Sequence, residues 1–278
     1  MKKMSLVFAV IFCLLLSGCT PAVPPATASL PEYETAQTTV PTSVPTSAPA
    51  TEPSAESTEA STAEPETQPP EHSPLYIPGV EAEDVILWFN EVCLDGEYIN
   101  SGDPSVVQKW VEPIVCRVVG TPTEEDLQVL ETFADWLNAL PGFPGIRITE
   151  DPGEVNLRFH FAAAEEMLMI MGENFSGMDG AATFWYSGTN EIYDGQICVR
   201  TEIGQYLRNS VILEELYNCL GPMQDTVLRA DSIITQEYAE PQKLSQVDEL
   251  ILMLLYHPDI LCGMDAGECE AVIRQLYY

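Results

Sequence analysis

The stretch that most constrains how this chain folds runs from Val211 to Gly221 and reads VILEELYNCLG. Wound into a helix at about 100° per residue, it gathers its apolar side chains on one side. Glu214, Glu215 and Asn218 fall together on the other side. Gly221 follows the last apolar residue, where a left-handed residue ends a helix. The pattern predicts an amphipathic core helix with a polar, mainly acidic triplet on its outer or cleft-facing side.

The spacing within this helix resembles the metzincin protease motif H-E-x-x-H-x-x-G-x-x-H. That motif has two zinc-binding histidines one turn apart, a glutamate general base and a glycine that ends the helix. The corresponding residues here are Glu214 (first His), Glu215 (catalytic Glu), Asn218 (second His), Gly221 (glycine) and Gln224 with Asp225 beside it (third ligand). The resemblance implies a metzincin-like frame from which every histidine is missing.

The residues at the ligand positions make a poor zinc site. Zinc in proteins is held mainly by His and Cys, whereas Asn218 and Gln224 offer only amide groups. Calcium suits the oxygens of Glu214, Glu215, Asn218 and Asp225 better, but one helix face and one loop do not make a dedicated cage. We therefore predict vestigial ligand positions, no metal and no cofactor.

Two enzymatic alternatives use the same acidic residues. In the first, the domain is a peptidase-like hydrolase in which Glu215 acts as general base with an atypical or absent metal. In the second, two carboxyl groups act as a glycosidase pair. Glu214 and Glu215 diverge by about 100° around the helix and cannot readily flank one bond, while Glu215 with Asp225 is geometrically freer.

The first 19 residues have the pattern of a targeting segment. Lys2 and Lys3 precede an apolar run from Ser5 to Leu16 that is too short for an ordinary membrane span. The run ends in Leu-Ser-Gly-Cys19, which resembles the bacterial lipobox, in which the cysteine is lipidated. This predicts a protein anchored to the cell membrane through lipidated Cys19 and facing an extracytoplasmic compartment. The alternative is a plain signal peptide or a short anchor.

Residues 20–74 are rich in Pro, Thr, Ser, Ala and Glu and contain almost no large apolar residue. Such a composition cannot bury enough surface to offset chain entropy, so it predicts a disordered linker. The whole chain has 43 acidic and 11 basic residues, a formal charge of −32. Because this charge repels phosphate backbones, nucleic-acid binding is excluded.

Residues 75–278 have the composition of one folded domain of the α+β class, with a small mixed sheet packed against long helices. Apolar spacing predicts helices over 83–93, from Thr123 to a break at Pro141, over 162–171 and over 245–256. Alternation predicts strands over 106–119, 155–161 and 195–201, with a loop and an edge strand within 175–194. Thr123 with Asp126 and Ser245 with Asp248 form predicted capping boxes.

The segment after the central helix extends the resemblance. It has the L-S-x-x-D start and L-Y end of the helix that follows the Met-turn in matrixin-type metzincins, with Ser232-Ile233-Ile234 at the Met-turn itself. These residues resemble a bacterial envelope family known as domain of unknown function 2927. The motifs that carry it are E-E-L-x-x-x-L-G from Glu214, Asp225, Ser232-Ile233, Asp248-Glu249-Leu250, Leu255-Tyr256-x-Pro258 and Gly263-Met264. The chain departs from that family at Asn218, where Gln is common, and at Pro222, where Leu is common.

The mature chain has six cysteines besides Cys19: Cys93, Cys116, Cys198, Cys219, Cys262 and Cys269. In an exported domain they permit three disulfides in several pairings. Cys262 and Cys269 bracket a short Gly-containing segment and are the easiest pair to bridge. Cys219 fits equally well as a buried free thiol, and several reduced core cysteines are the alternative.

These observations favour a non-enzymatic domain that acts as a binding or structural module at the cell envelope, with a partner that the sequence does not identify. The alternative is the hydrolase that uses Glu215. The state of the cleft discriminates between them. A filled cleft favours the module, and an open cleft around Glu215 favours the enzyme.

Overall fold

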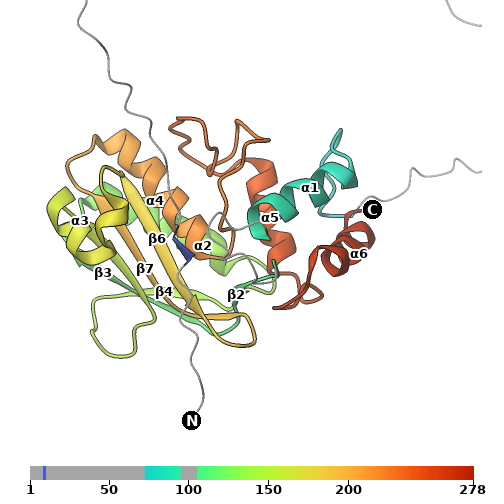
Figure 1. Cartoon of the computed structure of the whole chain (residues 1–278), viewed down its shortest axis with the longest axis horizontal. Helices are drawn as coiled ribbons and strands as arrows, with labels where there is room; N and C mark the ends of the chain where they lie inside the picture. Colours follow the sequence, from blue (N-terminus) through green and yellow to red (C-terminus); the bar gives the residue numbers. More distant parts are fainter. Residues whose placement is uncertain (1–8, 11–72, 95–104) are drawn as a thin grey trace, which may run out of the picture. The chain divides into compact units, whose positions relative to one another are not determined.

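The computed structural model of the chain describes residues 9–10, 73–94 and 105–278 (Figure 1). The predicted signal peptide and linker lie outside these residues, except for 9–10 and 73–74. Within the described residues, none of the helices combines the length and the hydropathy needed to cross a bilayer.

The described strands form one mixed sheet, as the predicted fold class requires. Its order is β1-β6-β7-β5-β3-β4, and β2 pairs with β7 beyond this path. Strands β4, β3, β5 and β7 run parallel to one another, while β6 is antiparallel to β7 and to β1. The strands are β1 (Ala9–Val10), β2 (Lys109–Trp110), β3 (Ile114–Gly120), β4 (Ile146–Thr149), β5 (Leu157–Ala162), β6 (Gly180–Tyr186) and β7 (Glu191–Arg200).

Helices cover both faces of this sheet and form a separate group beside it (Figure 1). Helices α2 and α4 pack on one face, and α3 lies against β7 on the other. Helix α1 packs against α5 and α6. The helices are α1 (Ala82–Cys93), α2 (Glu124–Asn138), α3 (Ala164–Met171), the short 3₁₀ helix η1 (Glu173–Phe175), α4 (Gln205–Cys219), α5 (Gln246–Leu255) and α6 (Ala266–Tyr277).

The local signals in the sequence place most of these elements correctly. Leu157, Phe159 and Phe161 alternate along β5 and are buried against the α2–α4 side of the sheet. Both predicted capping boxes form. The Asp126 amide donates to Thr123 Oγ1 at 3.1 Å, and the Asp248 amide donates to Ser245 Oγ at 3.2 Å.

The prediction of a single strand over 106–119 is wrong, because the structure divides it into β2 and β3. Between them, Val111 and Glu112 turn outward and are exposed, and Pro113 has no N–H to donate to a neighbouring strand. Strand β7 begins at Glu191, four residues earlier than predicted. The predicted edge strand is β6, which pairs with β1 on its outer side.

The segment from Cys262 to Cys269 is not only a loop. Helix α6 begins at Ala266, and Asp265 caps it by accepting from the Glu268 amide at 3.0 Å. Glu268 completes a third capping box, a signal that is present in the sequence. Cys269 therefore lies on a helix and is buried.

Candidate functional site

The central helix α4 lies directly against the sheet at Glu215. A Cβ atom placed on Gly180 of β6 would come within 2.4 Å of Val211 Cγ1 and 2.7 Å of Glu215 Oε1. Only glycine allows this approach, because real Cβ atoms do not make such short contacts. The strand therefore closes over the part of α4 that carries Glu215.

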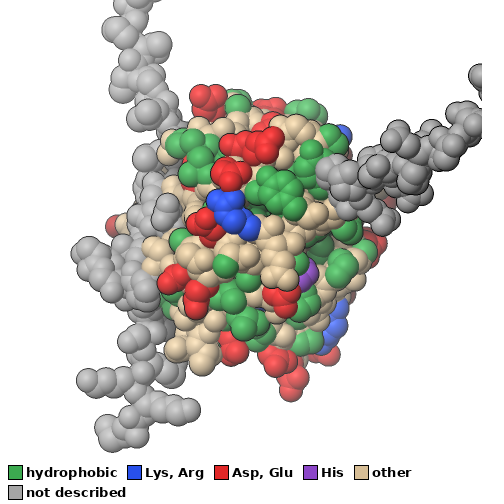
Figure 2. All heavy atoms as spheres, turned by 90° about the vertical axis from the view of Figure 1, so that its right-hand side faces the viewer, with side chains coloured by type: hydrophobic (Ala, Val, Ile, Leu, Met, Phe, Trp, Pro, Cys, Tyr) green, Lys and Arg blue, Asp and Glu red, His purple; other side chains and the backbone are tan. Residues whose placement is uncertain are grey.

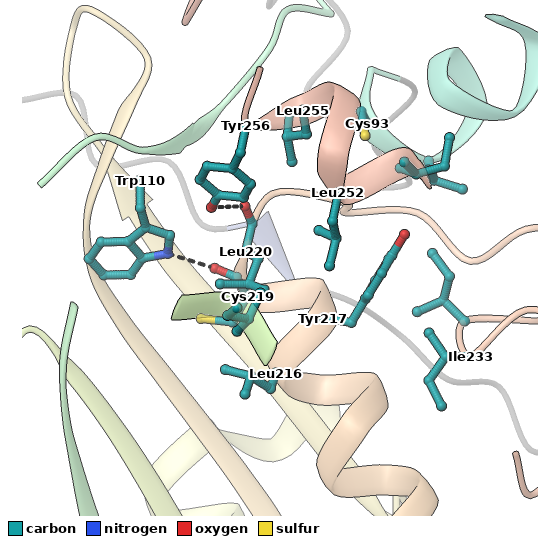
Figure 3. Close-up of a cluster of buried hydrophobic side chains, with 14 of the residues drawn as sticks. Cys93, Trp110, Leu216, Tyr217, Cys219, Leu220, Ile233, Leu252, Leu255 and Tyr256 are labelled. Carbon is teal, nitrogen blue, oxygen red and sulfur yellow. Dashed lines mark hydrogen bonds between the residues drawn. The ribbon is translucent and has the colours of Figure 1, made fainter. Parts of the chain in front are cut away.

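The C-terminal end of α4 is fixed by side chains from distant elements (Figure 3). Trp110 Nε1 donates to the Cys219 carbonyl at 2.9 Å, and the Tyr256 hydroxyl donates to the Leu220 carbonyl at 2.8 Å. These bonds satisfy carbonyls that a helix end leaves without partners. Gly221 then adopts φ 129°, as the predicted C-cap requires, and a Cβ there would lie 2.4 Å from the Gln108 carbonyl oxygen.

The polar triplet, predicted on an outer or cleft-facing side of the helix, lies on an enclosed side, where Glu214 and Glu215 line a cavity. Glu215 is 2% exposed and Asn218 is 0% exposed, while Glu214 is half-buried. Helix α4 is covered by β6 and β7 on one side and by α2 on another, so its polar side is enclosed as well. Among the described residues, Glu215 Oε2 and both amide atoms of Asn218 have no hydrogen-bond partner of standard geometry.

Such unsatisfied groups are rare in folded proteins, and they set the electrostatics of the site. Burial raises the pKa of Glu215 well above its ordinary value of 4.5, and the charges of Glu214 and Asp225 raise it further. Folding thus favours the neutral, protonated form of this carboxyl. A protonated carboxyl donates a hydrogen bond and does not act as a base.

The cavity next to Glu215, called here the Glu215 cavity, has a volume of about 60 Å³. Three predicted site residues, the start of β6 and a loop contribute to its walls. The lining residues are Glu214, Glu215, Asp225, Asp179, Gly180, Leu207, Val211 and residues 235–239. Asn218 and Gln224 do not line it. The structure therefore brings together Glu214, Glu215 and Asp225 but not the full predicted ligand set.

The residues at these positions do not fit the zinc that a metzincin frame implies. In the parts of the chain that the structure describes, no three His, Cys, Asp or Glu side chains are arranged to hold a metal ion. Asn218, at the second histidine position, has only an amide to offer, and Gln224 lies outside the cavity.

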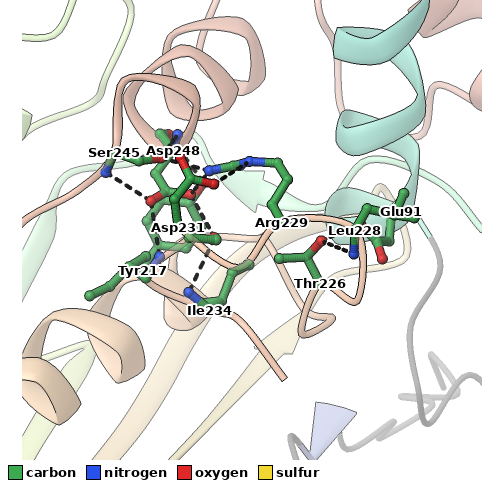
Figure 4. Close-up of polar contacts among 11 residues, drawn as sticks. Glu91, Tyr217, Thr226, Leu228, Arg229, Asp231, Ile234, Ser245 and Asp248 are labelled. Atoms are coloured by element: carbon green, nitrogen blue, oxygen red, sulfur yellow. Dashed lines mark hydrogen bonds and ion pairs between the residues drawn. The ribbon is translucent and has the colours of Figure 1, made fainter. Parts of the chain in front are cut away.

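A second buried carboxylate, Asp248, organises the segment where a Met-turn is expected (Figure 4). Asp248 is 0% exposed and accepts from Arg229 Nη2 at 2.9 Å, Ser232 Oγ at 2.7 Å, and the backbone amides of Ile233 and Ser245, both at 2.9 Å. The Ser232-Ile233 and Asp248 motifs thus tie this loop to the start of α5. Their role in the structure is to hold the fold.

The Glu215 cavity and the Asp248 cluster both lie within a segment that matches a protein family. The family model described as protein of unknown function (DUF2927) matches residues 82–275. The chain belongs to this family. No curated protein matches the chain. The DUF2927 match spans α1 to α6 and so includes the Glu215 cavity and the Asp248 cluster.

The DUF2927 domain has a second, larger cavity that the sequence reasoning missed. It measures about 800 Å³ and lies between α2, α4 and the start of α5; we call it the α2–α4 groove. The predicted apolar face of α2 is Leu127, Leu130, Phe133, Leu137 and Leu140. Val129, Thr132, Phe133 and Trp136 form another helical stripe that lines the groove. In the sequence, the apolar residues Val129 and Trp136 lie outside the predicted apolar face of this helix, and this second stripe could have indicated the groove.

One end of the groove is fixed by a buried ion pair between the two helices. Arg208 Nε of α4 donates to Asp126 Oδ1 at 2.8 Å, and Gln205 Nε2 donates to the same oxygen at 2.6 Å. Burial acts to raise the pKa of Asp126, but the hydrogen bonds from Arg208, Thr123 and Gln205 outweigh it and lower the pKa.

All six cysteines within the described residues are free thiols, so the structure does not contain the predicted Cys262–Cys269 disulfide. Cys269 is buried on α6, whereas Cys262 is half-buried and contacts the Lys109 carbonyl at 3.8 Å. Burial raises the pKa of the Cys269 thiol to about 12, as it does for Cys116 and Cys198. Cys219 is buried on α4, in agreement with the reading as a core thiol.

Proposed function

We propose that this chain is a lipid-anchored envelope protein whose DUF2927 domain is a non-catalytic binding or structural module on a metzincin-like frame. The observation that supports this proposal best is the enclosure of Glu215. The carboxyl lines a narrow, partly open cavity of about 60 Å³ between Gly180 and the 235–239 loop. Ligand pockets usually measure roughly 300–1,000 Å³, so a peptide bond with its flanking residues does not fit.

The chemistry of the site points the same way. A zinc protease needs three ligands that hold the metal and a glutamate that takes a proton from the metal-bound water. Here the second ligand position is the buried amide of Asn218, and Glu215 has a pKa raised toward the protonated state. The second ligand position therefore differs in residue type from a zinc site, and folding shifts Glu215 away from the ionised form that a general base needs.

A hydrolase that uses Glu215 is the second candidate, and one observation favours it. Glu215 and Asp225 share a cavity, and a carboxyl with a raised pKa beside a second carboxyl is a pattern seen in acid–base catalysis. This mechanism requires the 235–239 loop to open. The test is hydrolysis of a peptide library. If the wild type cleaves the library and Glu215→Gln does not, the domain is this hydrolase and not a non-catalytic module.

Metal content tests the non-catalytic proposal directly. Elemental analysis of purified protein should find no stoichiometric zinc, and a chelator should leave the melting temperature unchanged. Zinc in the wild type would overturn the proposal. The metzincin relation needs a separate test, because Asn218 and Gln224 do not line the Glu215 cavity. A metzincin-like frame would turn Glu214→His, Asn218→His and Gln224→His together into a zinc site, and added zinc would then raise the variant's melting temperature. If the triple variant folds but zinc does not change its melting temperature, the domain does not have a metzincin-like frame.

The membrane anchor is tested by one substitution outside the folded domain. Cys19→Ala removes the thiol that carries the lipid, so the protein should move from the membrane to the soluble fraction, whereas Cys13→Ala should not release it. Unchanged membrane fractionation of Cys19→Ala would contradict lipid anchoring at this residue. Cross-linking on intact cells that make the protein should then capture its envelope partner equally with wild type and Glu215→Gln.

A further inference from the structure

The α2–α4 groove is built as a binding site rather than as a packing defect. Its volume of about 800 Å³ lies in the usual range for ligand pockets. Its floor is apolar and comes from three elements: Phe133 and Trp136 of α2, Leu213 of α4, and Leu244 before α5. The rings of Phe133 and Trp136 lie 6.0 Å apart at a tilt of 43°, so they offer an aromatic surface.

The rim of the groove is acidic on both sides of this floor. Glu124 and Glu125 begin α2, and Glu249 lies in the first turn of α5. Asn209 donates to Glu125 at 2.8 Å, but the carboxylates of Glu124 and Glu249 have no hydrogen bond or ion pair within the described part of the chain. Lys243 is the only basic residue among those that line the groove.

These charges determine which occupants fit. A second copy of the chain carries the same formal charge of −32, and residues 20–74 contain several glutamates and no lysine or arginine, so both are repelled. The chain as a whole, with 43 acidic and 11 basic residues, is repelled by an anionic lipid surface. Acidic side chains also dominate over basic ones on the side of the molecule that carries α1 and α6 (Figure 2). A positively charged occupant is complementary to the rim.

We propose that the α2–α4 groove binds a basic peptide segment of a partner protein. Lysine or arginine side chains on both flanks of an apolar residue match the arrangement of carboxylates on two walls with an apolar floor between them. The apolar residue packs on Phe133, Trp136 and Leu213, and the flanking cations pair with Glu124 and Glu249. This inference rests on the proposed binding function and names the chemistry of its partner.

The test uses the full mature chain carrying Cys19→Ala and a short capped peptide with lysine at each end and leucine–tryptophan–leucine between them. Isothermal titration should show saturable binding that weakens as salt is added, because the rim charges are exposed. The same peptide with glutamate in place of lysine should not bind. Equal binding of both peptides, or no binding of the basic peptide, would overturn the proposal.

Matched variants locate the site on the groove. Glu124→Gln with Glu249→Gln should weaken binding about tenfold, since two exposed ion pairs are lost. Glu131→Gln removes a charge from α2 outside the groove and should change the affinity less than about twofold. Thr132→Trp fills the groove from an exposed position on α2 and should abolish binding, with circular dichroism and the melting temperature confirming the fold. Equal effects of Glu131→Gln and the double variant would exclude the groove.

A small cation is the remaining alternative occupant. Tryptamine carries one ammonium group and one aromatic ring, so it reaches only one wall and should bind much more weakly than the peptide. Tryptamine binding as tight as the peptide would overturn the peptide proposal. None of these outcomes involves zinc or hydrolysis, so failure here is distinguishable from failure of the non-catalytic function.

Discussion

Asp248 and Glu215 are both fully buried carboxylic acids of this domain, yet their surroundings are opposite. Asp248 accepts four hydrogen bonds, one of them from the guanidinium of Arg229. Glu215 has one oxygen without a partner in the described residues and two acids nearby that repel its charge. The cost of burying an acid is therefore offset where donors surround it and remains where they do not.

The difference lies in the donors that each acid meets: Asp248 ties surrounding groups together, whereas one oxygen of Glu215 has no partner among the described residues. Asp248 ties the loop that contains Ser232 and Ile233 to the start of α5. Sequence spacing predicts Glu215 as the counterpart of a metzincin catalytic base, and in the structure it lines the Glu215 cavity together with Glu214 and Asp225. The non-catalytic function proposed above accounts for a buried carboxyl that has one oxygen without a partner among the described residues.

The largest effect that this comparison predicts is the loss of Asp248. Asp248→Ala leaves Arg229 buried without its main partner and leaves the amides of Ile233 and Ser245 without acceptors. Removing one member of a buried ion pair costs about 3–5 kcal/mol, so denaturant unfolding should show a loss of this size. A cost below about 1 kcal/mol would show that other contacts hold the loop. It would contradict the view that the hydrogen bonds of Asp248 set it apart from Glu215.

Glu215→Gln should change stability in the opposite direction. Because folding raises the pKa of Glu215, the carboxyl contributes stability that is present below its unfolded pKa, about 4.5, and is lost as pH rises through the folded pKa. Each pKa unit of that rise corresponds to about 1.4 kcal/mol at high pH. Glutamine does not titrate, so the variant should be more stable than wild type at neutral and alkaline pH.

The measurement is the free energy of unfolding of both proteins between about pH 4 and pH 9. The gap between variant and wild type should be small at the acidic end and should widen as pH rises, because only the wild type must ionise a buried group. Two parallel profiles would mean that Glu215 does not titrate differently in the folded protein. A variant that is less stable at every pH would mean that the carboxylate has a favourable partner after all.

The sequence alone predicts those features that depend on neighbouring residues. The capping boxes at Thr123 and Ser245 and the helix end at Gly221 each require only a few adjacent residues, and all three are confirmed. The alternation along β5 is equally local. The fold class follows because such elements, taken in order, leave few ways to bury their apolar faces.

The environment of Glu215 could not be predicted this way, because it depends on residues far away in the chain. Gly180 brings β6 against α4, and the 235–239 loop forms another wall of the cavity. A helical pattern identifies which side chains share a face but not what covers that face. The α2–α4 groove was missed for the same reason, since Trp136 can fill a core or line a cavity in the same helical register.

The smallest predicted effect concerns the second acid beside Arg229. Asp231 Oδ1 lies 3.6 Å from Arg229 Nε, but its side chain is 68% exposed, whereas that of Asp248 is 1% exposed. Water and salt screen the exposed pair, so Asp231→Ala should change the unfolding free energy by less than about 1 kcal/mol, and less at high salt. The two aspartates have the same formal charge and share one arginine. A difference in unfolding free energy between the two variants therefore reports burial and hydrogen bonding, not charge. A cost for Asp231→Ala equal to that for Asp248→Ala would mean that net charge around Arg229 governs stability, and that the satisfied hydrogen bonds of Asp248 do not.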